Sequence, residues 1–399
     1  MAKPTLELAD VLHRHGEACR QDHAGTLTRG ALRVLRAIEI CRTATLGGHV
    51  DACDSCGHRR ISYNSCRNRH CPKCQALARA SWLEARKADL LPVPYFHVVF
   101  TVPEEVAEVA LHNKAVVCGI LFRAAARTLK TVAADPRHLG AEIGFAAVLP
   151  TWGQTLQHHP HLHCVVPGGG LAPDGERWIG CRPGFFLPVK VLSRLFRRLF
   201  LEQLDGAFAS GQLRFPGSCA GLAEPGGLAG HLAPVRTRDW VVYAKPPFGG
   251  PEQVLEYLGR YTHRVAIANH RLVDLVDGRV RFHWKDYRHH GKRKVMSLTA
   301  DEFIRRFLLH VLPDGFARIR HDGLLGNRGR AAKLAVCRRL LKVPPPEPVV
   351  LAADYRERFE RLTGCSLCRC PVCGAGTMVV IEILPATTGR SRRLRIDTS

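Results

Sequence analysis

The sequence predicts an α+β protein, with an antiparallel sheet flanked by helices and preceded by a helical zinc-binding module. Short runs rich in β-branched and aromatic residues, such as 95–102 and 161–167, alternate with longer stretches of helical periodicity. Two C-x-x-C pairs lie close together near the N-terminus, which is typical of a metal site. The 399 residues are 46% hydrophobic and 23% charged, a composition typical of folded domains.

The elements are predicted from periodicity and from turn residues. Residues 5–46 have apolar side chains every three to four positions and are expected to be helical. A helix is expected from Gln75 to about Leu90, and residues 104–133 are expected to form one long helix. The Asp277-Gly278 pair between two alternating runs predicts a tight hairpin.

The order of these elements predicts three consecutive domains. Residues 1–92 form the zinc-binding module, residues 93–330 a larger domain of mixed strands and helices, and residues 331–399 a basic tail with a second group of cysteines. Strands and long helices interleave in the middle part, which indicates one sheet with helices packed on it.

Charge and cysteine content narrow the classes of partner and compartment. The chain has 58 Lys and Arg against 35 Asp and Glu, a net charge of +23, which favours a polyanion such as nucleic acid. No apolar run approaches the roughly 20 residues of a membrane span, and the charged N-terminus lacks a signal-peptide pattern. We therefore expect a cytoplasmic protein with no membrane partner, whose 16 cysteines bind metal rather than form disulfides.

The N-terminal cysteine pairs predict one structural zinc ion. Fourteen residues separate Cys53-x-x-Cys56 from Cys71-x-x-Cys74, so each pair can hold one side of a tetrahedral ion. The same segment holds four other possible ligands that could replace one of these or form a second site, although a role as polar loop residues is favoured: His49, His58, Cys66 and His70.

A second group of cysteines lies in the tail. Its members are Cys365, Cys368, Cys370 and Cys373. Four cysteines within nine residues leave little chain with which to surround one ion. The sequence is therefore compatible both with a second zinc site and with a tail that binds no metal.

Three histidines alternate along one predicted strand. His159, His161 and His163 point to one face, whereas Leu162 and Cys164 point to the other. One interpretation is a divalent metal held by two or three imidazoles, with open positions for water or substrate. The alternative is an exposed or internally satisfied histidine run.

Two tyrosines lie one helical turn apart downstream. Tyr257 and Tyr261 are at i and i+4, and Arg260 and Arg264 share a neighbouring face at the same spacing. The tyrosines could be packing residues. They could also be nucleophiles, because a tyrosyl oxygen can attack a phosphodiester beside a metal ion and cations.

These motifs together resemble a known family. The segments CDSCGHRRISYNSCRNRHCPKCQ, HPHLHCVVPGGGL and EYLGRYTHRVAIANHRL are similar, in this order, to the zinc-binding domain, metal strand and tyrosine helix of rolling-circle insertion-sequence transposases. The resemblance is to the HUH (His-hydrophobic-His) two-tyrosine class, and it extends from about residue 10 to residue 330. It implies an HUH endonuclease-like core.

The resemblance also implies an activity and its residues. It implies an enzyme that nicks and rejoins single-stranded DNA at element ends through a 5′-phosphotyrosine intermediate, with Mg²⁺ or Mn²⁺ as catalytic metal. His161 and His163 match the metal pair. The motif does not fix the third ligand, for which His159 lies on the right face and Gln157 lies two residues further back on the same face. Tyr261 matches the first nucleophile and Tyr257 the second, while Arg260 and Arg264 offset phosphate charge.

Two other functions stay open at this point. A plasmid relaxase or replication initiator would share the same core. A zinc-dependent nucleic-acid-binding protein without catalysis would explain the charge and the cysteines, but it gives the histidine strand and the tyrosine pair no use.

Overall fold

The computed structural model describes residues 6–245, 253, 255–256, 259, 266–345 and 355–387. The chain forms two compact units that are not consecutive in sequence. Unit 1 comprises Met1–Trp82, His263–Val311 and Pro348–Ser399, and unit 2 comprises Leu83–Thr262 and Leu312–Glu347. This division differs from the predicted consecutive boundaries at 92 and 330, because the middle and the end of the chain fold with its N-terminal part.

The central element of unit 2 is a five-stranded antiparallel sheet. Its order is β12-β4-β5-β3-β8, so the histidine strand β5 is the middle strand, as predicted. The strands are β3 (Tyr95–Thr101), β4 (Gly144–Val148), β5 (His161–Pro167), β8 (Val242–Lys245) and β12 (Ile319–Gly323). A small hairpin is formed by β6 (Gly169–Leu171) and β7 (Trp178–Gly180).

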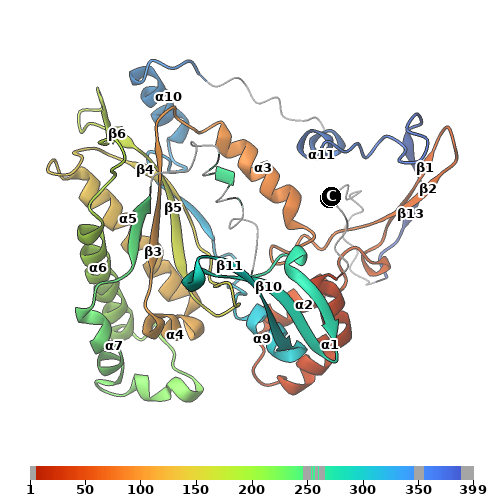
Figure 1. The fold of residues 1–399 in the computed structure, drawn as a ribbon, viewed down its shortest axis with the longest axis horizontal. Helices are drawn as coiled ribbons and strands as arrows, with labels where there is room; N and C mark the ends of the chain where they lie inside the picture. The colour runs from red at the N-terminus through yellow and green to blue at the C-terminus, as the bar shows by residue number, and fades with distance from the viewer. Residues whose placement is uncertain are drawn as a thin grey trace. The chain divides into compact units, whose positions relative to one another are not determined.

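Four helices cover one face of this sheet (Figure 1). They are α4 (Glu104–His112), α5 (Lys114–Ala134), α6 (Val189–Ala209) and α7 (Gly227–Thr237). Phe100 of β3 and Leu162 of β5 are fully buried against them, with Phe196 of α6 in the same core. This core fixes the middle strands through the side chains on their helix-covered face. The side chains on the other face of these strands are available to form a site.

The predicted helix over residues 104–133 is two helices. Asn113 separates α4 from α5, and its side-chain amide donates to the carbonyl oxygens of Val109 and Arg214 at 3.0 and 2.8 Å. The amide thus satisfies the carbonyl group of Val109, which a continuous helix would bond internally, and ties this break to the segment that contains Arg214. Periodicity alone did not reveal this break, because apolar side chains recur on both sides of it.

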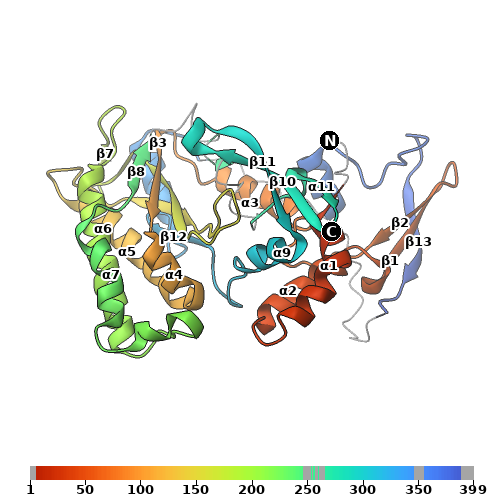
Figure 2. The same cartoon turned by 60° about the horizontal axis from the view of Figure 1, so that its bottom comes forward.

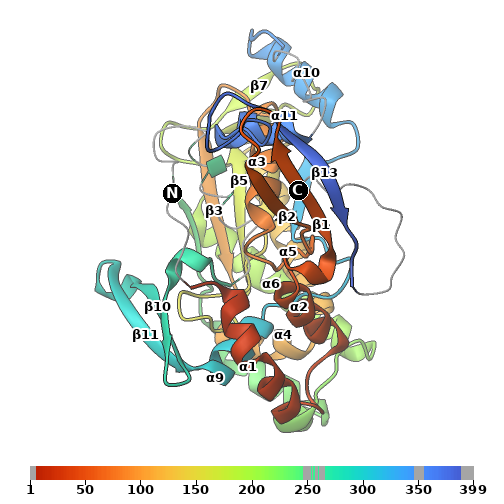
Figure 3. The same cartoon turned by 90° about the vertical axis from the view of Figure 1, so that its right-hand side faces the viewer.

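Unit 1 contains two three-stranded antiparallel sheets. The first has the order β13-β1-β2, with β1 (Gly48–Cys53), β2 (Arg59–Tyr63) and β13 (Met378–Leu384), which Figure 3 shows side by side. Gly47 precedes β1 at φ +67°, and a Cβ there would lie 2.5 Å from the carbonyl oxygen of Leu384. Glycine is therefore needed for the close approach of the C-terminal strand to the N-terminal one.

The second sheet of unit 1 has the order β11-β10-β9. It consists of β9 (Leu272–Val276), β10 (Arg279–Asp286) and β11 (Lys292–Thr299). The predicted hairpin at Asp277-Gly278 is confirmed, since both residues have the positive φ that such a two-residue turn requires. Helix α9 (Ala300–Leu308) packs on this sheet and also contacts α1 (Leu8–Asp22), which in turn packs on α2 (Arg29–Glu39).

Three further α-helices are α3 (Gln75–Lys87), α10 (Arg330–Leu340) and α11 (Tyr355–Thr363). In the described ranges, none of the helices has both the length and the apolar character to span a bilayer.

Candidate metal centres and the histidine strand

Four thiols that are separated in sequence meet at the first metal centre. They belong to Cys41, Cys66, Cys71 and Cys74, and all their sulfur atoms lie within 4.8 Å of one another. The Sγ atom of Cys74 is 3.4 Å from that of Cys41 and 3.6 Å from that of Cys66. Hydrogen bonds from the neighbouring thiols, that of Cys41 first, lower the pKa of Cys74, so this cluster favours a thiolate.

The second centre joins a segment near the N-terminus to a segment near the C-terminus. Cys53 and Cys56 lie at the turn between β1 and β2, and Cys370 and Cys373 lie in a loop just before β13. The Sγ–Sγ distances are 3.7 Å for Cys53 and Cys373 and 3.6 Å for Cys56 and Cys370. Backbone N–H groups, that of Gly376 first, lower the pKa of Cys373 to about 6, which favours its thiolate at neutral pH.

Both cysteine predictions therefore need correction. A single site from Cys53, Cys56, Cys71 and Cys74 is wrong, because β1 and β2 carry the first pair to one end of their hairpin and each pair finds other partners. A compact second site within the tail is also wrong, because only two of its four thiols join a cluster.

The remaining two tail cysteines lie outside both centres. Cys365 is exposed, and Cys368 accepts a hydrogen bond from the guanidinium group of Arg356 at 3.9 Å. Cys66 was one of the possible replacement ligands in the sequence, although a role as a polar loop residue was favoured, and the structure places it in the first centre. Cys41 was missed, because it belongs to no C-x-x-C pair and only the folded chain brings it beside the second N-terminal pair.

Each four-thiol centre fits a structural zinc ion. A tetrahedron with Zn–S bonds of about 2.3 Å has S–S edges of about 3.8 Å, close to the separations found here. Four thiolates also close the coordination shell, which excludes substrate and makes such a site structural. In a third group, formed by Cys19, His23 and Asp301, Nε2 of His23 lies 3.0 Å from a carboxylate oxygen of Asp301 beside the buried thiol of Cys19.

The first centre gives a direct prediction for a residue outside any motif. Cys41→Ser is expected to lower the zinc content of the purified protein from two equivalents to about one, because three thiolates hold zinc more weakly than four. Zinc content by atomic emission measures this. Cys118→Ser, a buried cysteine of α5, is the matched control and should keep both equivalents. Full zinc retention by Cys41→Ser would contradict the assignment.

The histidine strand has the predicted alternation of faces. Leu162 and Cys164 are fully buried on the helix-covered face, and His161 and His163 lie on the opposite face. The ring centroids of His159, His161 and His163 follow one another at 5.3 and 4.9 Å, so the three imidazoles form a row. Burial lowers the pKa of His161 to about 4 and that of His163 well below its usual value, which keeps both rings neutral at pH 7.

Hydrogen bonds fix the orientation of the two strand imidazoles. Nδ1 of His161 lies 2.7 Å from the carbonyl oxygen of His159, to which only a protonated Nδ1 can donate. Nδ1 of His163 lies 2.8 Å from Nε2 of His97 on β3. In each case the partner engages Nδ1 and leaves Nε2 as the nitrogen that could bind a metal, because hydrogen bonds to one ring nitrogen orient metal-binding histidines in this way.

His97 is a residue that the sequence reasoning missed. Its ring stacks on that of His163 with centroids 4.9 Å apart, and Tyr243 of β8 meets it edge-on at 6.1 Å. Burial lowers the pKa of His97 to about 4. A lone histidine in a β-rich run carries no signal in sequence, and only the pairing of β3 with β5 brings it to His163.

The tyrosine helix falls mainly outside the described residues. Tyr257, Arg260, Tyr261 and Arg264 are among those not described, so their roles stay predictions. Gly259 is described, and a Cβ at this position would lie 2.9 Å from a methyl carbon of Leu83 on α3. A glycine between the two tyrosines thus permits close contact with α3.

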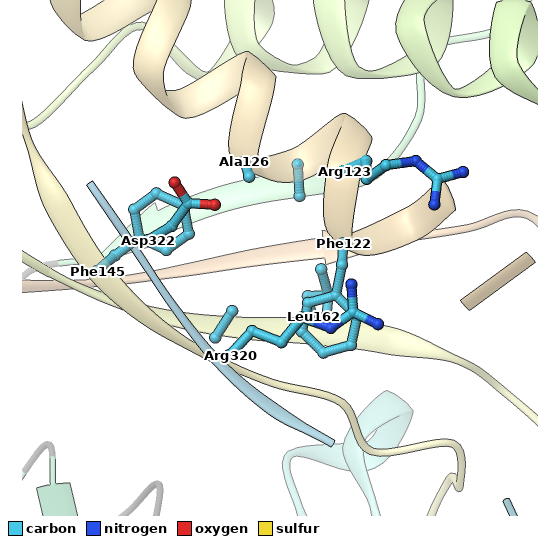
Figure 4. A pocket seen from close by; sticks show the side chains of 9 residues that line it. Phe122, Arg123, Ala126, Phe145, Leu162, Arg320 and Asp322 are labelled. Carbon is cyan, nitrogen blue, oxygen red and sulfur yellow. The ribbon is translucent and has the colours of Figure 1, made fainter. Parts of the chain in front are cut away.

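A pocket on the helix-covered face of the sheet is distinct from the imidazole row (Figure 4). It lies between α5, β4, β5 and β12, and Leu162 lines it from the side of β5 that carries no histidine. The guanidinium carbon of Arg320 lies 4.2 Å from the ring centroid of Phe122, and Asp322 pairs with Lys130 at 2.7 Å. These contacts tie β12 to α5, so the pocket is part of the packing of the sheet.

Fold and site together define a zinc-binding α+β protein with an imidazole row on its central strand. Comparison with known families gives two matches. Residues 11–102 match the family described as transposase zinc-binding domain, and residues 144–332 match the family described as putative transposase. No solved structure matches the chain.

Two curated relatives extend this likeness over the whole chain. A putative transposase, y4qJ, of Sinorhizobium fredii is 63% identical over 394 residues, which cover 98% of this chain and 99% of that protein. The transposase for insertion sequence element IS801 of Pseudomonas savastanoi pv. phaseolicola is 27% identical, covering 88% of this chain and 85% of that protein. The chain belongs to this family of transposases with an N-terminal zinc-binding domain. DNA is therefore its partner, in agreement with the net charge of +23.

Proposed function

We propose that this transposase nicks and rejoins single-stranded DNA through a 5′-phosphotyrosine intermediate during rolling-circle transposition. The observation that supports it most is the pair of buried, neutral imidazoles on the middle strand of the sheet, His161 and His163, each with Nδ1 engaged by a second group. Such oriented pairs are costly to bury without a ligand. A relaxase or a non-catalytic DNA-binding protein is less consistent with relatives that are transposases.

The imidazole pair fits a divalent metal. His161 and His163 would hold it through Nε2, and His97 would orient His163. Imidazole ligands favour Mn²⁺ over Mg²⁺, which prefers oxygen. With two imidazole ligands, such a metal would keep open positions for substrate oxygens, and it would polarise a phosphate oxygen.

Cleavage is assigned to the tyrosine helix. The Tyr261 hydroxyl loses its proton to water and its oxygen forms a bond to phosphorus, while the bond from phosphorus to the 3′ oxygen breaks and the leaving 3′ oxygen takes up a proton from water. The products are a 5′-phosphotyrosine and a free 3′ hydroxyl, and the reverse attack rejoins a strand. Arg260 and Arg264 offset charge on the phosphate, and Tyr257 serves the second cleavage.

The test of this function is metal-dependent nicking by histidine variants. His161→Ala and His163→Ala are each expected to reduce cleavage of a single-stranded oligonucleotide with the element's end below detection, with Mn²⁺ more effective than Mg²⁺. His97→Phe keeps the stacked ring but removes the partner of Nδ1, and a loss of about 10- to 100-fold in Mn²⁺ affinity is expected. Denaturing gels measure the cleavage, and calorimetry measures the Mn²⁺ affinity.

A control variant on the same strand shows whether lost cleavage comes from lost metal binding or from misfolding. Cys164→Ser lies on the same strand but on the helix-covered face, and it should retain Mn²⁺ binding and nicking. Parental cleavage by His161→Ala or His163→Ala would overturn the metal assignment. The absence of any metal-dependent nick from the unmodified protein would overturn the proposed function.

A further inference from the structure

We propose that the outer half of the β10–β11 hairpin, residues 283–295, is a binding arm for single-stranded DNA. Its lysines and arginines would contact phosphates, and the ring of Tyr287 would stack on an unpaired base. The inference rests on the proposed function, because it supposes that the substrate of this transposase is single-stranded.

The inner and outer halves of the hairpin differ in what covers them. At the inner end, Val280 and Phe282 are fully buried, and Phe282 meets Phe303 of α9 with ring centroids 5.8 Å apart. Figure 2 shows α9 beside this end of the sheet. Beyond His283 most side chains are exposed, including Val295 with 51% of its surface accessible. The inner half therefore anchors the hairpin, and the outer half is available to a ligand.

The exposed outer half is strongly cationic. Lys285, Lys292, Arg293 and Lys294 are exposed, and Asp286 is the only acidic residue between 283 and 295. That carboxylate already binds Lys294 and His289, each at 2.7 Å, and the ammonium group of Lys294 is the main cause that lowers the pKa of Asp286 to about 2.

Two of these cations, Lys292 and Arg293, are not neutralised locally. Lys292 and Arg293 pair with no acidic side chain in the part of the chain that the structure describes. Soluble surfaces usually intersperse charges of both signs. A run of cations with its one carboxylate already engaged is instead suited to a polyanion.

Aromatic rings stand among these cations. Tyr287 lies at the tip of the hairpin with 69% of its surface exposed, which is unusual for a large ring that could pack. Lys294 lies 5.8 Å from the ring centroid of Trp284, on the same strand pair. Basic side chains beside an exposed ring are the elements by which proteins hold single strands, because any base can stack on the ring while phosphates meet the cations.

Exposure of the ring at a tip favours single strands over duplex DNA. In a duplex the base faces are covered by their neighbours, so only phosphates and groove edges would be available to the hairpin. A single strand offers both base faces and phosphates. The contribution of Tyr287 should therefore depend on the presence of unpaired bases.

The experiment measures binding of the full-length zinc-loaded protein to fluorescent oligonucleotides by anisotropy. Tyr287→Ala is expected to weaken binding to a single strand about ten-fold or more, and Tyr287→Phe to bind like the parent, because stacking needs only the ring. Neither substitution should change binding to the matching duplex or to a strand whose bases are removed. Lys292→Ala/Arg293→Ala should reduce the slope of log affinity against log salt concentration by about 1.4.

Matched controls come from exposed residues of unit 2. Phe185→Ala removes a ring that is 47% exposed, and Arg182→Ala/Lys190→Ala removes two exposed cations; both should bind like the parent. Parental binding by Tyr287→Ala, or an equal loss on duplex and single strand, would overturn the inference. Failure of the unmodified protein to bind single strands would instead show that the proposed function is at fault.

Discussion

Tyr261→Phe is expected to abolish the covalent protein–DNA adduct completely while zinc content and oligonucleotide binding stay at parental values. Phenylalanine keeps the ring and its packing and removes only the attacking oxygen. A phenol has a pKa of about 10 and is a weak nucleophile at neutral pH, so water or another side chain at the same position is no substitute for an oriented tyrosyl oxygen. Denaturing gels of protein incubated with Mn²⁺ and a labelled single strand measure the adduct.

The second tyrosine supplies the comparison. Tyr257→Phe should still form the first adduct but should lose strand transfer, and peptide mapping should place the trapped 5′ phosphate on Tyr261. If both variants form the adduct like the parent, the tyrosines are packing residues and the proposed chemistry is wrong. An adduct mapped only to Tyr257 would exchange the two roles.

Cys370→Ser is expected to remove one of two zinc equivalents and to unfold the sheet that joins the two chain ends. Structural zinc sites contribute about 10–16 kcal/mol of binding free energy in small zinc domains, so their loss can unfold the surrounding element. Because β13 pairs with β1 from Gly48 to Cys53, amide hydrogens in β1 should exchange faster although the substitution lies more than 300 residues away. Zinc analysis and hydrogen exchange measure both effects.

Two neighbouring cysteines provide the matched control. Cys365→Ser and Cys368→Ser change the same kind of residue in the same segment, but neither thiol belongs to a cluster, so both zinc equivalents and slow exchange in β1 should remain. Equal zinc loss in all three tail variants would restore a site made within the tail. No loss in Cys370→Ser would remove the chain-spanning centre.

The sequence by itself determined much of the site on the central strand. The alternation of His161, Leu162 and His163 defined which side chains face the core, because strand geometry has a period of two. Asp277-Gly278 likewise determined a hairpin, since few residues other than these adopt positive φ at low cost. Local patterns of this kind need no knowledge of distant contacts.

Tertiary structure alone decided which cysteines share a metal centre and which groups hydrogen-bond to the strand imidazoles. Cys53 and Cys56 have the same spacing as Cys71 and Cys74, yet the first pair meets Cys370 and Cys373 because β13 pairs with β1. His97 likewise reaches His163 only through the pairing of β3 with β5. Spacing in sequence tells which ligands can share one side of an ion, whereas the long-range strand pairing that completes its shell is set by the packing of the whole chain.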